Sequence, residues 1–546
     1  MKRESDENEE FQALAHDVLN YMLERYPALG TSMGLHEYDS LMPDGRREAV
    51  LELIEKLKEF RQAISTLDER KLSEDNRIDR LIALRNLDLR IFDAEELRFW
   101  ECAPTGVGVV GEHIFVLFMK DFAPIGVRFK NIKNRLIAAP KYLEQARSLV
   151  TDPVKIWTET QVESAERFPG FLSLIESVGE KALGDDHFEE FRQAVSSTLR
   201  SVEDYTSWMK NLLPEAREDF AIGPEKFQRL LELSSIEMPV EEIYALGKRC
   251  LEEEKERVKK ISKLINPQAS LEEVKELVKS DHPKDFAEVM ELYKRSIDRV
   301  RQFVKNHGIA TMPPSERLKV IETPEFLRPI IPHAAYWPPG KFERDQQGVY
   351  LVTPVEEKME MLKEHNYASI GNTSVHEAYP GHHLQLACSN LNPSIVRAMT
   401  SANETVEGWA HYCEDMMREH GFDESPEARF MKSIDLVWRA ARIIVDIDLS
   451  TGKMSFDEAV KFLMKEVGME EPFALAEVKR YTRYQGYQLC YLLGKHLIME
   501  LREKVKERMG QKYSEKFFHD AILYAGSIPV KFLQMEFDRR LKEKGF

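Results

Sequence analysis

The sequence predicts a mainly α-helical protein with one small β element. Apolar residues recur at helical spacing over long stretches, for example along residues 286–304. Seven prolines between residues 312 and 340 interrupt this pattern, and such a density excludes a helix there. Short β-branched or aromatic runs flank these prolines. We therefore expect two helical lobes around a deep cleft, with a small antiparallel β element near residues 316–353.

Before this proline-rich segment, residues 1–310 are predicted to form an N-terminal helical region. Prolines such as Pro124, Pro140 and Pro153 are expected to separate its long helices. Residues 311–546 would form a metal-binding catalytic region, continuous with the first. After the β element we expect a helix from residue 356 to about 391. Further helices are expected at residues 403–420, 426–449, 455–467, 471–508, 513–524 and 528–543.

Composition limits the possible functions. The chain has 546 residues, of which 43% are hydrophobic, and this is ample for a large core. Its net charge of −17 argues against nucleic acid and against anionic membrane surfaces, since both attract basic patches. No apolar run approaches the roughly 20 residues that span a bilayer. The first ten residues are polar and lack the apolar core of a signal peptide, so we expect a cytoplasmic protein. The oligomeric state stays open.

Three histidines and a glutamate fall within residues 376–383. In the zinc-peptidase motif H-E-x-x-H, two histidines one helical turn apart bind the metal, and the glutamate is the general base. Here Pro380 occupies the position of the second histidine. A Pro-Gly pair often distorts a helix. Such a distortion could bring either His382 or His383 to the metal that His376 binds.

A second polar segment follows at residues 404–415. Glu407, His411 and Glu414 are spaced at i, i+4 and i+7, so they share one face of a helix. A face of this kind is either solvated or part of a site. Its combination with the preceding histidine cluster favours a site.

Both segments resemble the family called domain of unknown function 885, whose hallmark is H-E-x-x-P-G-H-x-x-Q. Residues 376–385 match every fixed position, and residues 407–410 match the family's E-G-W-A segment. The resemblance is close in the catalytic region and loose before it. The family in turn resembles gluzincin peptidases of the thimet-oligopeptidase kind. Those carry H-E-x-G-H followed by E-x-x-S-x-x-x-E, and residues 407–414 have the latter spacing with Ala410 in place of serine.

This resemblance implies one Zn²⁺ per chain, bound by His376, His382 and Glu407. Alignment of Gly381-His382 with the Gly-His of H-E-x-G-H favours His382 over His383. Two imidazoles and a carboxylate suit zinc and leave a fourth position for water.

The resemblance also implies catalytic roles. Glu377 would be the general base. Tyr491 would stabilise the oxyanion, because related peptidases place tyrosines on a late helix that faces the metal. Tyr487, one turn earlier, shares its face and would bind substrate or support the site.

Further candidates would hold the ligands or the substrate. Glu414 and Asp446 are candidates to orient the metal ligands. Arg480 and Arg483 are candidates to bind a substrate carboxylate. His383, if it is not a ligand, could contact the substrate or the transition state.

The sequence therefore predicts a zinc-dependent hydrolase, foremost a metallopeptidase that cleaves short peptides with metal-activated water. One alternative is a zinc hydrolase acting on a non-peptide amide or ester. Another is a metal-free binding scaffold with a disabled site. Two departures from the family pattern, Ser450 for a histidine and Tyr487 for a glutamine, bear on substrate choice. The sequence does not distinguish endopeptidase from carboxypeptidase action.

Overall fold

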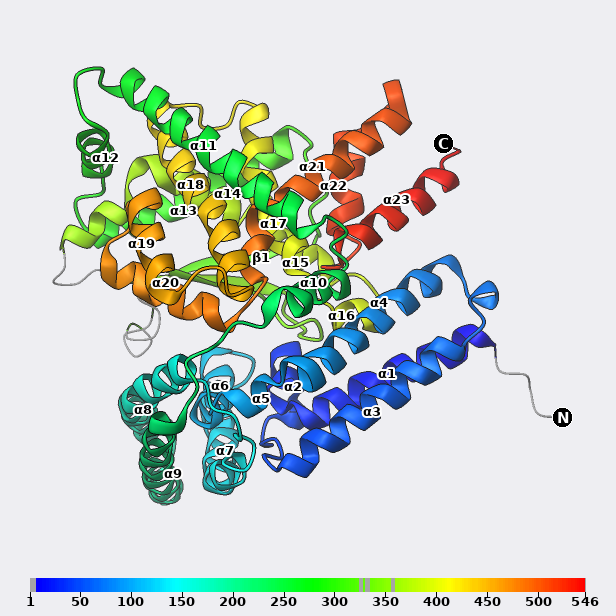
Figure 1. The fold of residues 1–546 in the computed structure, drawn as a ribbon, viewed down its shortest axis with the longest axis vertical. Helices are drawn as coiled ribbons and strands as arrows, with labels where there is room; N and C mark the ends of the chain where they lie inside the picture. The colour runs from blue at the N-terminus through cyan, green and yellow to red at the C-terminus, as the bar shows by residue number, and fades with distance from the viewer. Residues whose placement is uncertain (1–5, 324–327, 329–333, 355–358, 546) are drawn as a thin grey trace. The chain divides into compact units, whose positions relative to one another are not determined.

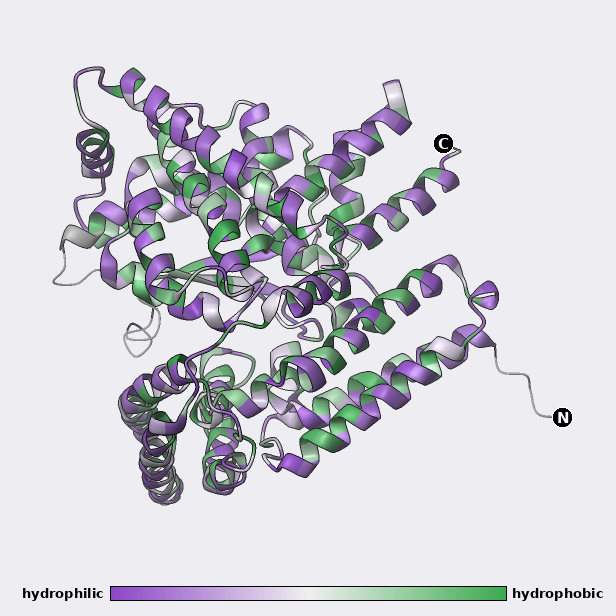
Figure 2. Ribbon diagram, viewed as in Figure 1, coloured by the Kyte–Doolittle hydropathy of each residue, from purple (hydrophilic) through white to green (hydrophobic). Residues whose placement is uncertain are grey.

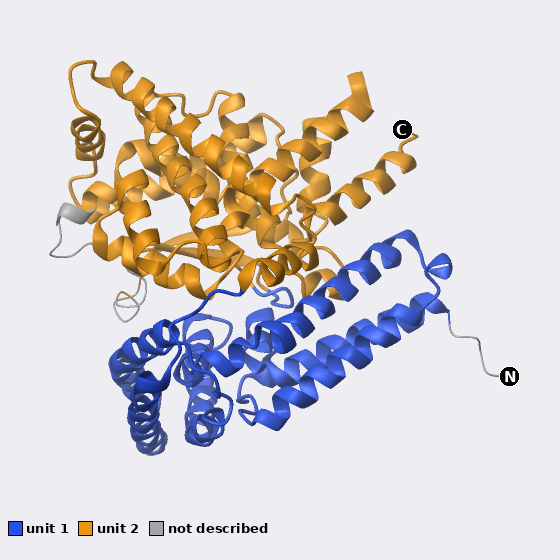
Figure 3. Ribbon diagram, viewed as in Figure 1, with its two compact units in different colours: residues 1–222, 340–344 blue, residues 223–339, 345–546 orange. Residues whose placement is uncertain are grey.

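The computed structural model describes residues 6–323, 328, 334–354 and 359–545. It confirms the predicted mainly α-helical fold with a small β element (Figure 1). The chain forms two compact units, residues 1–222 with 340–344, and residues 223–339 with 345–546 (Figure 3). The division that we placed at 310/311 marks the start of the proline-rich segment, whereas the compact units divide at 222/223. The second unit holds every predicted site residue.

The regular elements of the first unit's described part are helices, apart from an isolated β-bridge between Val154 and Arg217. Hydrophilic and hydrophobic residues alternate along its helices, as expected for amphipathic helices (Figure 2). Its helices are α1 (Glu7–Arg25), α2 (Pro27–Met33), α3 (Arg47–Thr66), α4 (Glu74–Phe92), α5 (Phe99–Cys102), α6 (Gly106–Met119), α7 (Ile125–Ala146), α8 (Lys155–Ala182) and α9 (Asp185–Leu212).

One predicted break in this unit is wrong, because α7 runs through Pro140. A proline inside a helix leaves the carbonyl four residues earlier without its amide donor. Here that carbonyl belongs to Leu136, and the hydroxyl of Thr198 on α9 donates a hydrogen bond to it at 2.9 Å. The side chain on the neighbouring helix thus replaces the missing donor and allows the helix to continue.

The second unit contains fourteen α-helices in its described part. They are α10 (Gly223–Leu233), α11 (Val240–Ile265), α12 (Leu271–Ser280), α13 (Phe286–Asn306), α14 (Tyr367–Glu377), α15 (His382–Ser389), α16 (Ile395–Ala398), α17 (Asn403–Glu419), α18 (Pro426–Ser450), α19 (Phe456–Val467), α20 (Glu471–Arg483), α21 (Cys490–Met509), α22 (Glu515–Leu523) and α23 (Val530–Glu543).

The helix predicted over residues 471–508 is interrupted between α20 and α21. Gly486 adopts a φ of +77°, in the left-handed region that favours glycine. The carboxylate of Asp446 on α18 accepts the backbone N–H groups of Gly486 and Gln488 at 2.9 and 2.8 Å. This buried carboxylate fixes the turn at which the chain changes direction before α21.

The β element is a three-stranded mixed sheet. Its strands are β1 (Arg317–Glu322), β2 (Ala334–Trp337) and β3 (Gln347–Val352), in the order β1-β3-β2. β2 pairs with β3 in the antiparallel sense, as expected, but β1 pairs with β3 in parallel. The expectation of a purely antiparallel element is therefore wrong. β2 lies between β1 and β3 in the sequence but at one edge of the sheet in space. β3 is the central strand and runs parallel to β1.

Among the described residues, no single helix is long and apolar enough to cross a membrane. One pair of helices, Glu74–Cys102 and Gly106–Met119, meets that test of length and composition jointly, with a bend of 105° between them.

Candidate metal centre

A tight turn separates α14 from α15, at the Pro-Gly pair where we expected the helix to be distorted. The backbone N–H of Gly381 donates to the carbonyl of Val375 at 3.1 Å, so the chain folds back against the end of α14. A Cβ atom at position 381 would overlap the backbone carbonyl of His376, which explains the need for glycine. The indole of Trp409 donates to the carbonyl of Pro380 at 2.8 Å and anchors the turn to α17.

This turn brings His382 back to His376, beside Glu407 of α17. Nε2 of His376 lies 3.7 Å from Oε2 of Glu407, and Nε2 of His382 lies 3.5 Å from the same oxygen. One ligand atom from each residue lies within 4.8 Å of the others. Atoms bound to tetrahedral zinc at about 2.1 Å are roughly 3.4 Å apart, so the three side chains fit such an ion. Their side chains are 12–16% exposed, which leaves the cluster accessible.

The electrostatics of the cluster favour a cation. Burial raises the pKa of the Glu407 carboxyl, but hydrogen bonds from His376 and His382 outweigh it and hold this pKa well below its usual range. Burial likewise disfavours the charged form of His376, yet Glu407 and Glu414 together raise its pKa to about 10. The carboxylates thus attract positive charge to the point where the imidazoles converge.

Glu414 lies on the opposite side of His376 from Glu407. Its Oε1 accepts a hydrogen bond from Nδ1 of His376 at 2.8 Å and lies 3.2 Å from Nδ1 of His411. These three residues form a second cluster whose spacing could hold a metal. The 2.8 Å separation, however, is that of a direct hydrogen bond and is shorter than the spacing of two atoms that share an ion. Glu414 therefore orients His376 as a carboxylate behind a metal-binding imidazole does.

His383 lies outside this cluster although it is adjacent to His382. Its Nε2 lies 2.9 Å from Oε1 of Glu316, and its Nδ1 lies 3.0 Å from the hydroxyl of Tyr336 on β2. The side chain is fully buried. Both ring nitrogens are occupied, so the structure brings His382 and not His383 to His376. It also leaves His383 no ring nitrogen for a substrate.

The chain matches a known protein family and two solved structures. Residues 27–536 match the family described as bacterial protein of unknown function (DUF885). The chain belongs to this family. Two solved structures share its fold. A putative lipoprotein of unknown function from Shewanella oneidensis has a TM-score of 0.79 at 22% identity, over 96% of this chain and 98% of that one. The putative lipoprotein from Colwellia psychrerythraea has a TM-score of 0.85 at 19% identity, over 98% and 100%. No curated protein matches the chain.

Glu377 of this DUF885 protein ends α14 directly after His376. Its side chain is partly exposed. Burial, and next the negative charge of Glu377, raise the pKa of Tyr336. The hydroxyl of Tyr336 on β2 itself lies 3.0 Å from Nδ1 of His383. Sequence reasoning assigned no role to Tyr336 or to Glu316, since neither has a metal-ligand spacing.

Of the two predicted tyrosines, Tyr487 lies beside the cluster and Tyr491 packs against its neighbour His411. The hydroxyl of Tyr487 lies 3.5 Å from Oε1 of Glu407. Tyr491 packs edge-on against His411, with ring centroids 5.7 Å apart. Burial, and next the charge of Glu407, raise the pKa of Tyr491, so its phenol stays protonated at neutral pH.

Two other predicted residues have structural partners instead. Asp446 accepts hydrogen bonds from the turn before α21, and Ser450 donates to it at 3.1 Å. Burial raises the pKa of Asp446 to about 7. Arg480 forms an ion pair with Glu477 at 2.7 Å, and Glu477 also binds Arg442 at 3.2 Å. Asp446 therefore fixes a backbone turn and Arg480 has an acidic partner, while their roles as a support of the metal ligands and as a substrate-binding group stay predictions.

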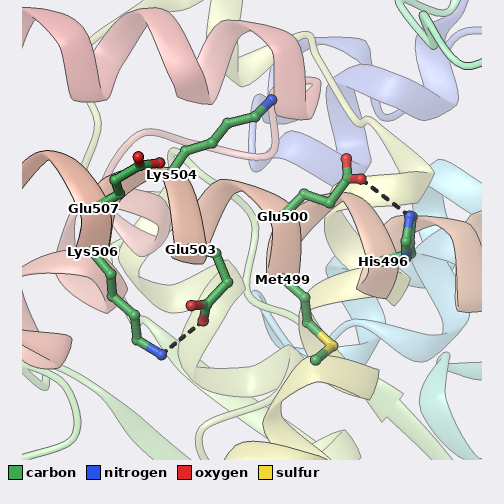
Figure 4. Close-up of a pocket in the computed structure, with 7 residues that line it drawn as sticks. All are labelled: His496, Met499, Glu500, Glu503, Lys504, Lys506 and Glu507. Carbon is green, nitrogen blue, oxygen red and sulfur yellow. Dashed lines mark hydrogen bonds and ion pairs between the residues drawn. The ribbon is translucent and has the colours of Figure 1, made fainter.

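A surface hollow along α21 does not form part of this site. Seven residues of this one helix line it, from His496 to Glu507 (Figure 4). Its charged residues pair with one another, as in Glu500 with His496 and Glu503 with Lys506. These pairs are typical of a solvated helix face.

Proposed function

We propose that the protein is a zinc-dependent hydrolase that cleaves peptide bonds, with His376, His382 and Glu407 as ligands. The observation that carries this proposal is the convergence of two imidazole Nε2 atoms on one carboxylate oxygen, at 3.7 and 3.5 Å. The hydrogen bond from His376 to Glu414 supports it, because it presents Nε2 of that ring to the cluster. Bound zinc would polarise the scissile carbonyl and lower the pKa of the attacking water.

The protein's own residues would move the proton and stabilise charge. Glu377 follows His376 directly in the chain and would accept a proton from the attacking water, then donate it to the leaving nitrogen. Tyr491 would donate a hydrogen bond to the developing oxyanion, since its raised pKa keeps its proton in place. Tyr487 would hold Glu407 through its hydroxyl.

The resemblance to gluzincin peptidases agrees with this assignment. In H-E-x-G-H the second histidine directly follows a glycine and lies four residues after the first histidine. Here His382 also directly follows a glycine, Gly381, but lies six residues after His376. The turn at Pro380 and Gly381 absorbs that additional length. The following glutamates, Glu407 and Glu414, then take the two sides of His376.

The first test is metal content. The protein, purified without chelators or a histidine tag, should contain close to one zinc per chain by inductively coupled plasma mass spectrometry. Glu407→Ala should contain little, because it removes a ligand. Absence of zinc from the wild type, even after zinc is supplied, would contradict the proposal and favour a metal-free scaffold.

The second test is turnover. The zinc-loaded protein should cleave unstructured peptides and lose activity with a chelator. Glu377→Gln should retain zinc but slow cleavage by about 10²–10⁴-fold, the usual contribution of a general base. A variant with unchanged turnover would exclude Glu377 as the base. Cleavage of amide or ester probes without cleavage of any peptide would identify a non-peptide hydrolase.

A further inference from the structure

Two arginines of α18 lie close to Tyr491, but only one has an acidic partner. Arg442 is fully engaged, since it pairs with Glu477 at 3.2 Å and donates to the hydroxyl of Tyr481 at 3.0 Å. Arg439 has no carboxylate within ion-pair distance among the described residues. Its Nε donates a long hydrogen bond of 3.4 Å to Nε2 of His411, and its Nη1 is buried without a partner in the described structure.

An unpaired guanidinium at this position requires an explanation. A buried donor without an acceptor costs about 1–3 kcal/mol, and more when it is charged. The acidic residue one turn earlier on α18, Asp435, does not come within ion-pair distance of Arg439, and burial raises the pKa of this carboxyl. Arg439 therefore retains a positive charge that its own helix does not neutralise.

Arg439 also lies beside the candidate metal centre. His411 separates it from Glu414, the carboxylate that holds His376. The guanidinium lies 5.5 Å from the ring centre of Tyr491 and 4.6 Å from that of Trp438. The side chains of Arg439, Trp438 and Tyr491 are all partly exposed. The charge thus belongs to an accessible surface with aromatic walls.

We propose that Arg439 binds the C-terminal carboxylate of the peptide substrate, which makes the protein a carboxypeptidase. This inference rests on the proposed peptide hydrolysis. Since Nε of Arg439 binds His411 and Nη1 is buried, the carboxylate would accept a charge-assisted hydrogen bond from Nη2. Trp438 and Tyr491 provide apolar surface for the terminal side chain.

The test compares a peptide acid with its C-terminal amide. An N-acetylated tripeptide ending in phenylalanine would be titrated, in both forms, into zinc-loaded Glu377→Gln protein by isothermal calorimetry. The acid should bind at least about tenfold more tightly than the amide, as expected for one charge-assisted hydrogen bond. When Arg439→Gln is added to the Glu377→Gln protein, the ratio of the acid and amide affinities should fall close to one. Arg439→Lys in its place should restore the preference only in part. Arg429→Gln, an exposed arginine on the same helix, is the matched control and should retain the preference.

The outcomes separate this inference from the proposed function. The acid peptide could bind more tightly than the amide while the protein that retains Glu377 hydrolyses neither peptide. This result would support the Arg439 site and contradict peptide cleavage. Hydrolysis of acid and amide at equal rates would support the peptidase and overturn the inference. A preference that survives Arg439→Gln, or binding of neither peptide, would also overturn it. If Arg439→Gln does not fold, the wild-type preference and Arg439→Lys still decide the matter.

Discussion

The Glu414 carboxylate accepts a hydrogen bond from Nδ1 of His376 at 2.8 Å, from within the interior of the second unit. Since Nδ1 donates this bond, the neutral ring that binds a metal would carry its proton on Nδ1 and its free lone pair on Nε2. That lone pair faces Glu407 and His382. One carboxylate thus sets the tautomer and orientation of a candidate ligand without touching the ion.

Glu414→Gln should therefore weaken zinc binding while leaving the three candidate ligands in place. Loss of such an outer partner usually costs about 10–100-fold in metal affinity. Competition with a chelating dye measures the zinc dissociation constant. Glu419→Gln, at the exposed C-terminal end of the same helix, is the control and should bind zinc as the wild type does. Equal affinity of wild type and Glu414→Gln would show that Glu414 does not orient His376.

His382 and His383 should differ sharply when each is replaced by alanine. His382→Ala should lose most of the bound zinc. His383→Ala should retain it, because both nitrogens of this ring bind protein groups, Glu316 and Tyr336. Its effect should be on stability, with a loss of about 1–3 kcal/mol from the weakened network around buried Glu316.

Metal content and urea unfolding of both variants check this contrast. Zinc loss from His383→Ala with retention in His382→Ala would reverse the assignment of the second ligand.

The local spacing of residues was sufficient to predict most helices, whereas the members of the cluster came from the resemblance to a known family. Periodicity placed α17, α18 and α19 nearly at their observed bounds. The set His376, His382 and Glu407 came from motif resemblance, and the structure brings these residues together. The break at Gly486 was missed, because its cause is a carboxylate 40 residues earlier, on another helix.

Residues whose role depends on tertiary packing were not predictable from sequence. Glu316 acts through a histidine 67 residues later, and its proline-rich surroundings show no motif. Arg439 has the helical spacing of an ordinary surface residue, and only the absence of a carboxylate near it in the described structure distinguishes it from Arg442. Pro140 continues a helix because Thr198 happens to lie opposite the freed carbonyl. Contacts between distant segments decide each of these cases.

The stability of the second unit should fall as the pH decreases from 7 to 5, in part because of His519. This ring donates from Nδ1 to the carbonyl of Ile309 at 2.8 Å, and its Nε2 lies 2.8 Å from the hydroxyl of Tyr412. Burial lowers the pKa of His519 to about 4, from an ordinary 6.5. Between these values the unfolded chain binds a proton that the folded chain does not, so acid favours unfolding. The contribution amounts to about 2 kcal/mol between pH 7 and 5.

His519→Gln should remove this part of the pH dependence, since an amide can still donate and accept hydrogen bonds but does not titrate. The measurement is the free energy of urea unfolding at pH 7 and pH 5, on metal-free protein so that ligand protonation does not contribute differently. The wild type should lose about 2 kcal/mol more than the variant. An equal decrease in the free energy of unfolding of both proteins would show that His519 is not held neutral.

The close crossing of α17 and α21 should tolerate no side chain at Gly408. A Cβ atom there would overlap the backbone of Gly494, and one at Gly494 would overlap the carbonyl of Glu404. Gly408 follows Glu407, and Gly494 lies one turn after Tyr491, so separation of the helices would displace a candidate ligand and a candidate catalytic residue together. Gly408→Ala should therefore lower both stability and zinc affinity, with a cost of about 1–3 kcal/mol or more from overpacking.

Gly170→Ala is the matched control, because its position in α8 is exposed and a Cβ there meets no atom. That control should be neutral or stabilising by up to about 1 kcal/mol, as alanine favours a helix over glycine. Thermal unfolding and zinc titration of both variants measure the difference, and a stable, zinc-binding Gly408→Ala protein would show that the crossing is not needed to build the site.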